Sequence, residues 1–169
     1  MIDRIASNLA EIEAHYTAVV VGSGYGAGVA ASRLARAGQR VAVLERGREI
    51  RPGEYPDDLG SAGAELQANG ERGRVGAADG LFELHLNRDM LAVVGCGLGG
   101  TSLINANVAL EMDPRLFAAE PWPAVYRDQP ALLQPHAERA RRMLGVSTYP
   151  ETWRTPDKMV SLQDSARAM

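Results

Sequence analysis

The chain has 169 residues, of which 46% are apolar and 23% are charged, and its net charge at pH 7 is −3. These values are ordinary for a globular protein. No cluster of Lys and Arg marks a nucleic-acid surface, and no apolar run approaches the ~20 residues that a membrane span requires. Cys96 is the single cysteine, which excludes an internal disulfide. Because the N-terminus also lacks the pattern of a secretory signal, we expect a cytoplasmic protein.

The first quarter of the chain predicts a βαβ unit. Residues 5–14 have the spacing of a short amphipathic helix. Residues 17–21 (TAVVV) form a β-branched run that is typical of a buried parallel strand. Residues 26–37 have helical composition and stop at Gly38, a residue type that commonly ends helices. Residues 40–44 (RVAVL) then predict a second buried strand.

The middle of the chain is less regular. Residues 47–80 are rich in Gly, Pro, Asp and Arg, with a weak helical pattern near 59–68, and predict a long surface excursion. Residues 81–86 and 90–94 are short apolar-rich runs joined by a turn, which predicts a β-hairpin. Residues 95–105 form a second glycine-rich segment that is expected to run into a helix.

The remaining part predicts helices. A short helix is expected from Asp113-Pro114, and residues 130–144 have the periodicity of an amphipathic helix, whereas the tail from Pro150 is weakly patterned. The predicted fold class is therefore α/β, with a Rossmann-like βαβ unit, a β-hairpin excursion and the start of a second domain.

The sequence Gly22-Ser23-Gly24-Tyr25-Gly26-Ala27 fits the pattern G-x-G-x-x-G/A between a predicted strand and a predicted helix. Gly22 permits a tight turn, Gly24 lets the backbone approach a pyrophosphate, and Ala27 is small enough to pack the helix on the strand. Glu45 ends the second strand, where a carboxylate accepts hydrogen bonds from ribose hydroxyls and repels a 2′-phosphate. The motif predicts a site for the ADP part of FAD or NAD; a glycine-rich turn without a ligand is the alternative.

A second motif, Gly99-Gly100-Thr101-Ser102-Leu103-Ile104-Asn105, follows an apolar run. Its glycines again allow the backbone to approach a ligand closely, and hydroxyl and amide side chains lie beside them. A single NAD site does not need two such loops, whereas the longer FAD does. The second motif therefore favours FAD.

Three segments resemble the glucose-methanol-choline (GMC) oxidoreductases, particularly their cholesterol oxidase branch. Residues 19–47 resemble the family's ADP-binding segment, residues 89–110 resemble its second glycine motif, and residues 113–144 resemble the start of its substrate domain. The resemblance implies a division into residues 1–112, the N-terminal part of an FAD-binding domain, and residues 113–169, the start of a substrate-binding or cap region.

The resemblance also implies roles for single residues. Tyr25 and Gly26 would contact the phosphates, Glu45 the adenosine ribose, and Val108 the isoalloxazine ring. The full set of expected cofactor-binding residues is Gly22, Gly24, Tyr25, Gly26, Ala27, Glu45, Gly99, Gly100, Thr101, Asn105 and Val108. None of His15, His85 and His136 lies where some members attach the flavin, so we expect non-covalent FAD. No catalytic residue and no metal ligand is assigned.

By the same resemblance, the complete enzyme would oxidise the CH–OH group of a small-molecule alcohol, with a sterol-like substrate as one candidate, and pass electrons to an acceptor. The family's catalytic base lies far towards the C-terminus, so we expect a truncated chain that lacks the base, leaves apolar strand edges uncovered and has the missing C-terminal part as a partner. Thr101 replaces a glycine of the branch, which favours a relative over a true cholesterol oxidase. The alternatives are an NAD-dependent Rossmann dehydrogenase and an inactive, truncated nucleotide-binding fragment.

Overall fold

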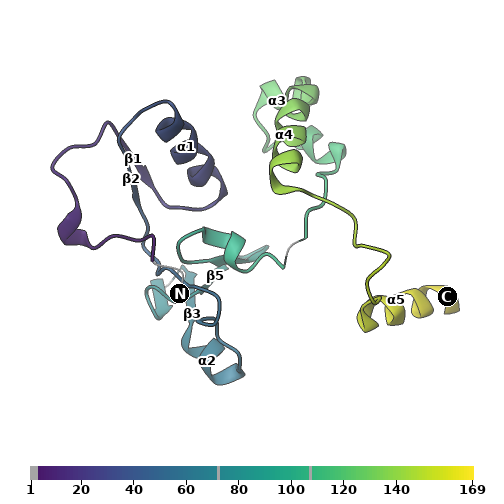
Figure 1. The fold of residues 1–169 in the computed structure, drawn as a ribbon. Helices are drawn as coiled ribbons and strands as arrows, with labels where there is room; N and C mark the ends of the chain where they lie inside the picture. Colours follow the sequence, from purple (N-terminus) through teal and green to yellow (C-terminus); the bar gives the residue numbers. More distant parts are fainter. Residues whose placement is uncertain (1–3, 72, 107) are drawn as a thin grey trace. The chain divides into compact units, whose positions relative to one another are not determined.

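The computed structural model describes residues 4–71, 73–106 and 108–169 (Figure 1). The chain divides into two compact units, Met1–Asn107 and Val108–Met169. The first unit contains both glycine motifs, which we call the first glycine loop (residues 22–27) and the second glycine loop (residues 99–105). In the described part of the chain, no helix is both long and apolar enough to cross a membrane.

The first unit begins with the predicted βαβ arrangement. It consists of β1 (Ala18–Val21), α1 (Tyr25–Arg36) and β2 (Val41–Leu44). The two strands pair in parallel, with Ala18 opposite Val41 and Val21 opposite Leu44. Because the strands are parallel, both end at the same edge, and the first glycine loop and Glu45 follow them there.

Helix α1 covers one face of this two-stranded sheet. Ala27, Ala31 and Leu34 are its less exposed residues, and their spacing of four and three positions places them on one side of the helix. The other face of the sheet is open within the unit: Val21 is 82% exposed. The strands are confirmed, but the predicted burial on both faces is wrong for the described residues, because α1 provides one covering layer.

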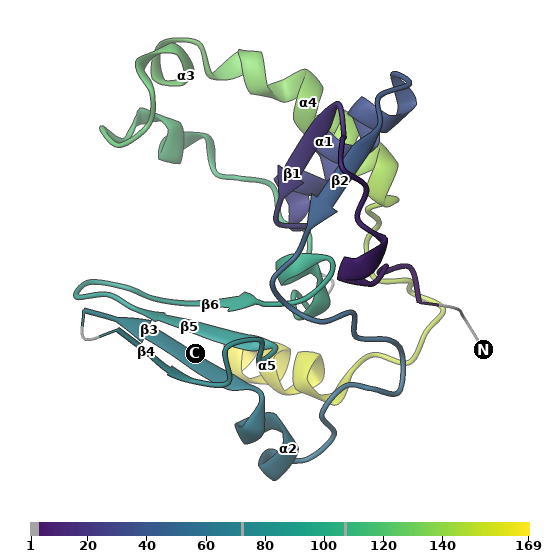
Figure 2. The ribbon, with the colours of Figure 1, turned by 90° about the vertical axis from the view of Figure 1, so that its left-hand side faces the viewer.

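A second, four-stranded sheet has the order β4-β3-β5-β6 (Figure 2). Its strands are β3 (Leu66–Gly70), β4 (Gly73–Gly76), β5 (Phe82–Leu86) and β6 (Leu91–Gly95). The antiparallel β5–β6 pair confirms the predicted hairpin. The predicted surface excursion is wrong in its second half, because β3 pairs with β4 and runs parallel to β5.

The best-buried residues of the first unit lie at one end of the four-stranded sheet. Leu81 and Cys96 are 0% and 3% exposed, and the Cys96 N–H donates to the Leu81 carbonyl oxygen at 2.8 Å. Gln67 is 1% exposed, and its amide nitrogen donates to the carbonyl of Gly80 at 2.7 Å. The second glycine loop follows directly after this buried end.

Two predicted helices of the first unit differ from the structure. Residues 5–14 contain a single 3₁₀ turn, Leu9–Glu11, because the N–H groups of Ile5 and Ala6 donate to the Glu49 carboxylate instead of a helical carbonyl. The second glycine loop contains a short 3₁₀ helix, Gly100–Leu103, rather than a longer α-helix. The weak helical pattern near 59–68 yields α2 (Leu59–Ala64).

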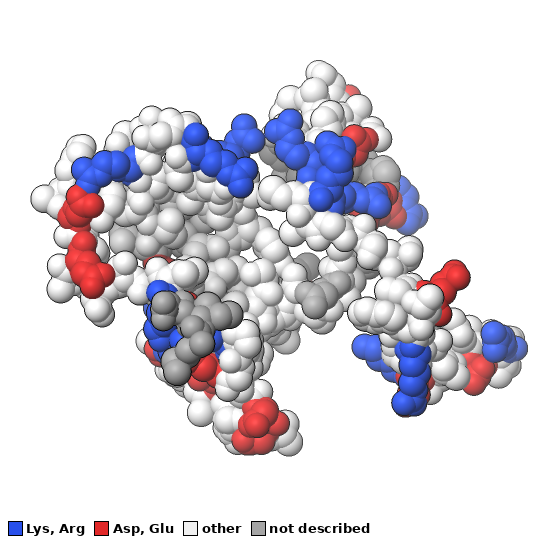
Figure 3. Space-filling model, in the orientation of Figure 1, with Lys and Arg blue, Asp and Glu red and all other residues white. Residues whose placement is uncertain are grey.

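The second unit consists of helices. These are the 3₁₀ helices Pro114–Ala118 and Pro130–Leu133, together with α3 (Ala124–Asp128), α4 (Gln134–Leu144) and α5 (Asp157–Ala168). The predicted helices near Asp113 and over 130–144 are confirmed, whereas α5 was not predicted. Basic side chains gather over α4 (Figure 3), which carries three arginines. One of these, Arg141, forms an ion pair with Glu111.

Candidate nucleotide-binding site

The first glycine loop opens the N-terminus of α1. Gly22 adopts φ +88°, a left-handed conformation that favours glycine, and its N–H donates to the Leu44 carbonyl at 2.7 Å. No side chain caps the helix at Gly24. A Cβ added to Gly24 or Gly26 would meet nothing within 4 Å. The chain's own packing therefore does not require glycine at these two positions, and the N–H groups of the first helical turn are open to an anionic ligand.

Glu45 lies immediately after β2, with both carboxylate oxygens held by the chain. Its Oε2 accepts from the backbone N–H of Ser23 at 2.9 Å and from the Ser23 hydroxyl at 2.6 Å. Its Oε1 accepts from the N–H of Gly47 at 2.9 Å. A carboxylate oxygen has two lone pairs, so Oε1 retains the capacity to accept a hydroxyl. The half-buried carboxylate is therefore fixed beside the N-terminal end of α1 with one acceptor position available.

The second glycine loop lies directly against the first. The N–H of Gly99 donates to the Ser23 hydroxyl at 2.9 Å. A Cβ added to Gly100 would lie 2.7 Å from the Cα of Gly24, which is closer than real side chains approach a backbone. The Asn105 amide nitrogen donates to the Tyr25 hydroxyl at 2.5 Å. Two motifs far apart in the sequence thus form one continuous backbone surface.

Two further expected site residues have other surroundings in the structure, and their roles stay predictions. The Thr101 hydroxyl accepts from the N–H of Gly95 at 3.3 Å, so it connects the loop to the end of β6. Val108 opens the second compact unit and is 65% exposed, and its expected place beside the flavin ring stays a prediction.

Sequence reasoning missed Gly47 and Gly97, whose backbones meet where the segment after β2 contacts the segment that leads into the second glycine loop. A Cβ added to Gly47 would lie 2.4 Å from the backbone nitrogen of Gly97. Next to this contact, the N–H of Leu98 donates to the carbonyl of Arg48 at 2.9 Å. The segment after Glu45 therefore packs on the segment that leads into the second loop. The sequence signal for this contact was the glycine that directly follows Glu45 and Arg46 after the end of β2.

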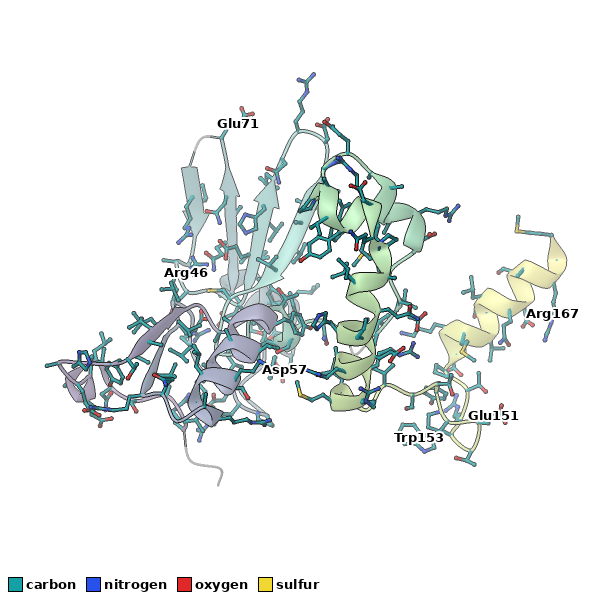
Figure 4. The ribbon with its side chains drawn as sticks, turned by 90° about the horizontal axis from the view of Figure 1, so that it is seen from above. Arg46, Asp57, Glu71, Glu151, Trp153 and Arg167 are labelled. Carbon is teal, nitrogen blue, oxygen red and sulfur yellow. The ribbon has the colours of Figure 1, made fainter. Side chains whose placement is uncertain are left out.

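Sequence reasoning also missed Arg46, which ties the end of β2 to the four-stranded sheet (Figure 4). Its guanidinium donates to the Gln67 side-chain oxygen and to the Ala78 carbonyl, each at 3.0 Å. It also forms an ion pair with the carboxylate of Glu83, which accepts a further hydrogen bond from Asn69. The Glu83 side chain is 8% exposed, whereas that of Arg46 is 41% exposed, so the ion pair joins a buried carboxylate to a partly exposed guanidinium.

The comparisons with known proteins match segments that contain these residues. Residues 17–68, which include the first glycine loop and Glu45, match the pyridine nucleotide-disulphide oxidoreductase family. The chain is 34% identical over 145 residues to a cholesterol oxidase of Mycobacterium tuberculosis, a match that covers 86% of this chain and 24% of that enzyme. It is 28% identical over 132 residues to a cholesterol oxidase of Acinetobacter baumannii, covering 78% of this chain and 23% of that enzyme. A long-chain-alcohol oxidase of Arabidopsis thaliana is 38% identical over 93 residues, covering 55% of this chain and 11% of that enzyme.

The chain is related to the N-terminal part of the GMC oxidoreductases. This GMC-type chain spans about a quarter of the length of the cholesterol oxidases that it matches. The matches imply a flavin or nucleotide cofactor and a dinucleotide-binding α/β fold. Both glycine loops fall in its first unit, which places the candidate cofactor site there.

Proposed function

We propose that this chain binds FAD non-covalently and forms the cofactor-binding part of a GMC-type alcohol oxidoreductase. The observation that carries the proposal is the contact between the two glycine loops, in which a Cβ on Gly100 would strike Gly24. An ADP group alone needs one such loop at a helix N-terminus. A second loop packed against the first extends the same surface, which suits a longer dinucleotide.

The residues of the first loop fit the ADP half of FAD. The open backbone at Gly24 and Gly26 would hold the phosphates at the positive end of the α1 dipole, next to Tyr25. Gly22 and Ala27 shape the turn and the packing of the helix. The available acceptor position of Glu45 would bind a ribose hydroxyl. The carboxylate there also repels a 2′-phosphate, so the site disfavours NADP.

In this proposal, the second loop extends the site towards the flavin. Gly99, Gly100, Thr101 and Asn105 would lie along the pyrophosphate and the flavin side, and Val108 near the ring. When bound, the flavin supplies a two-electron acceptor for the oxidation of an alcohol CH–OH group. In this proposal the residues of the two glycine loops bind and orient the flavin, and no catalytic base is assigned to the chain.

The substrate of the whole enzyme belongs to the same proposal. Relatives named for cholesterol and for long-chain alcohols support an alcohol with a large apolar body. We propose that residues 1–112 serve the cofactor and that residues 113–169 begin the substrate-binding or cap region. An electron acceptor and the C-terminal part of the enzyme would be the further partners.

Equilibrium titration of the purified chain with FAD, ADP and NAD tests the cofactor. We expect FAD to bind more tightly than ADP, because its flavin half contacts the second loop, and NAD to bind no more tightly than ADP. Glu45→Gln should weaken FAD binding about tenfold, since a hydrogen bond to a charged group contributes about 1.5 kcal/mol or more. Glu54→Gln, which alters a carboxylate paired with Arg4 and Arg51, is the control and should leave FAD affinity unchanged. Equal binding of NAD and FAD would favour the dehydrogenase alternative.

A further inference from the structure

Ser23 occupies the first variable position of the first glycine loop, and several polar groups converge on it. Its hydroxyl oxygen lies 2.6 Å from Glu45 Oε2, 2.9 Å from the backbone nitrogen of Gly99 and 3.3 Å from the Gly97 carbonyl oxygen. Its own backbone N–H donates to the same Glu45 oxygen at 2.9 Å. The motif G-x-G-x-x-G/A does not specify a hydroxyl at this position.

The hydrogen-bonding capacity of a serine gives this cluster a direction. A hydroxyl has one proton to donate and two lone pairs with which to accept. At these distances the proton goes to the charged Glu45 oxygen, which is nearer than the Gly97 carbonyl, and a lone pair accepts the Gly99 N–H. The result is a chain of two hydrogen bonds that runs from the second loop, through Ser23, to the carboxylate.

We propose that Ser23 is a positioning residue that orients Glu45 towards the cofactor and fixes the second glycine loop at the same time. This inference rests on the proposed FAD-binding function. The two bonds from Ser23 occupy both lone pairs of Oε2, which leaves the acceptor position of Oε1 as the one presented to a ribose hydroxyl. The Gly99 N–H, held by the same hydroxyl, fixes the loop proposed to contact the other half of FAD.

A serine that merely fills space would behave differently. An alanine at position 23 keeps the Cβ and the backbone N–H but removes both hydroxyl bonds. It leaves the Gly99 N–H without this acceptor and frees the Glu45 carboxylate to rotate about its remaining backbone partners. Affinity for the ribose and the position of the second loop should therefore change together.

The test compares Ser23→Ala and Ser23→Thr with Ser61→Ala in the full chain. Ser61 bonds with the Asp58 side chain at the start of α2, so Ser61→Ala also removes a hydroxyl bonded to a carboxylate, outside the two glycine loops. Two quantities are measured: FAD affinity by fluorescence titration, and hydrogen exchange at the Gly99 amide without flavin. Ser23→Ala should weaken FAD about tenfold and speed exchange at Gly99 about tenfold, whereas Ser61→Ala should change neither. Ser23→Thr retains the hydroxyl and should recover most of both losses.

A double-mutant cycle separates positioning from a general loss of stability. If Ser23 acts through Glu45, then Ser23→Ala combined with Glu45→Gln should lose clearly less FAD affinity than the sum of the two single losses. Additive losses, or a Ser23→Ala variant with wild-type FAD affinity, would overturn the inference. Absence of FAD binding by the wild-type chain, with faster Gly99 exchange in Ser23→Ala, would instead reject the proposed function and leave the link between the loops standing.

Discussion

The Cα of Gly24 and the backbone of Gly100 approach so closely that a Cβ on Gly100 would lie 2.7 Å from the Gly24 Cα. This contact joins the N-terminus of α1 to the loop that follows β6. It requires glycine at position 100 for two reasons, because the residue also adopts φ +62°. The arrangement of the two loops therefore depends on this position more than on the open glycines at 24 and 26.

Gly100→Ala should separate the two loops. The added Cβ meets backbone that cannot move aside easily, and the left-handed φ adds strain, so we expect a loss of about 1–3 kcal/mol in the free energy of unfolding. FAD affinity should fall at least about tenfold. Gly38→Ala is the control, because φ is +79° there but the space is open within 4 Å. It should destabilise the chain by about 1 kcal/mol with no effect on FAD affinity. Equal effects of the two variants on FAD affinity would contradict the close approach.

Gly26→Ala should separate ligand binding from stability. Its Cβ would meet nothing within 4 Å in the chain, and alanine is the better helix former at a position inside α1. We expect the free energy of unfolding to stay constant or rise by up to about 1 kcal/mol, while FAD affinity falls because the methyl group occupies the phosphate space. Gly63→Ala in α2 has the same open surroundings and should leave FAD affinity unchanged. Unaltered FAD binding in Gly26→Ala would place the phosphates elsewhere.

Arg46→Met should destabilise the first unit more than Glu83→Gln does. Without Arg46, the buried carboxylate of Glu83 keeps Arg74 at 3.5 Å but loses its shortest ion pair, and Gln67 and Ala78 lose a donor. Because Arg46 is partly exposed, we expect a loss of about 2 kcal/mol in urea denaturation. Arg40→Met breaks an exposed pair with Glu13 and should cost at most about 1 kcal/mol. A cost for Arg46→Met no larger than that of Arg40→Met would show that the link does not stabilise the unit.

The lowered pKa of Glu65 should make the free energy of unfolding depend on pH. Burial raises the pKa of its carboxyl, but hydrogen bonds from the Arg48 side chain and the Leu81 N–H, with the charge of Arg48, outweigh burial and hold the pKa below its ordinary value of 4.5. A carboxyl whose pKa is lower in the folded state stabilises above its unfolded pKa, and this contribution is lost as the pH falls through the folded pKa.

The matching measurement is urea denaturation of wild type and Glu65→Gln across the acid range. The wild type should be more stable by about 1 kcal/mol near neutral pH, and the difference should shrink below about pH 4.5. A difference that stays constant down to the lowest pH at which the chain folds would show that the Glu65 charge contributes nothing.

The βαβ unit could be predicted from the sequence because its signals are local. The strand around Val19, the helix that follows and the glycine after it are each encoded by neighbouring residues. The β3–β4 hairpin could not be predicted, because Leu66–Gly70 reads LQANG and Gly73–Gly76 reads GRVG, without the apolar alternation of a strand. β3 pairs with β5, a partner outside this segment, and β4 in turn pairs with β3.

In the candidate site, too, the local features could be predicted from the sequence and the contacts between distant segments could not. The sequence indicated both glycine loops and Glu45, since each belongs to a recognisable motif. It did not indicate that Ser23 connects Gly99 with Glu45, because that connection depends on how the chain returns after β6. The extra helix Asp157–Ala168 was also missed, in a segment whose residues are mostly exposed and carry little amphipathic signal.

Amide hydrogen exchange of the chain with and without FAD, read separately at residues 22–27 and 99–105, tests whether the two glycine loops form one cofactor site. If the two glycine loops form one cofactor site, FAD should slow exchange in both loops, whereas ADP should slow it mainly in the first. Slowing by FAD confined to residues 22–27, with residues 99–105 unchanged, would show that the second glycine loop is not part of the cofactor site.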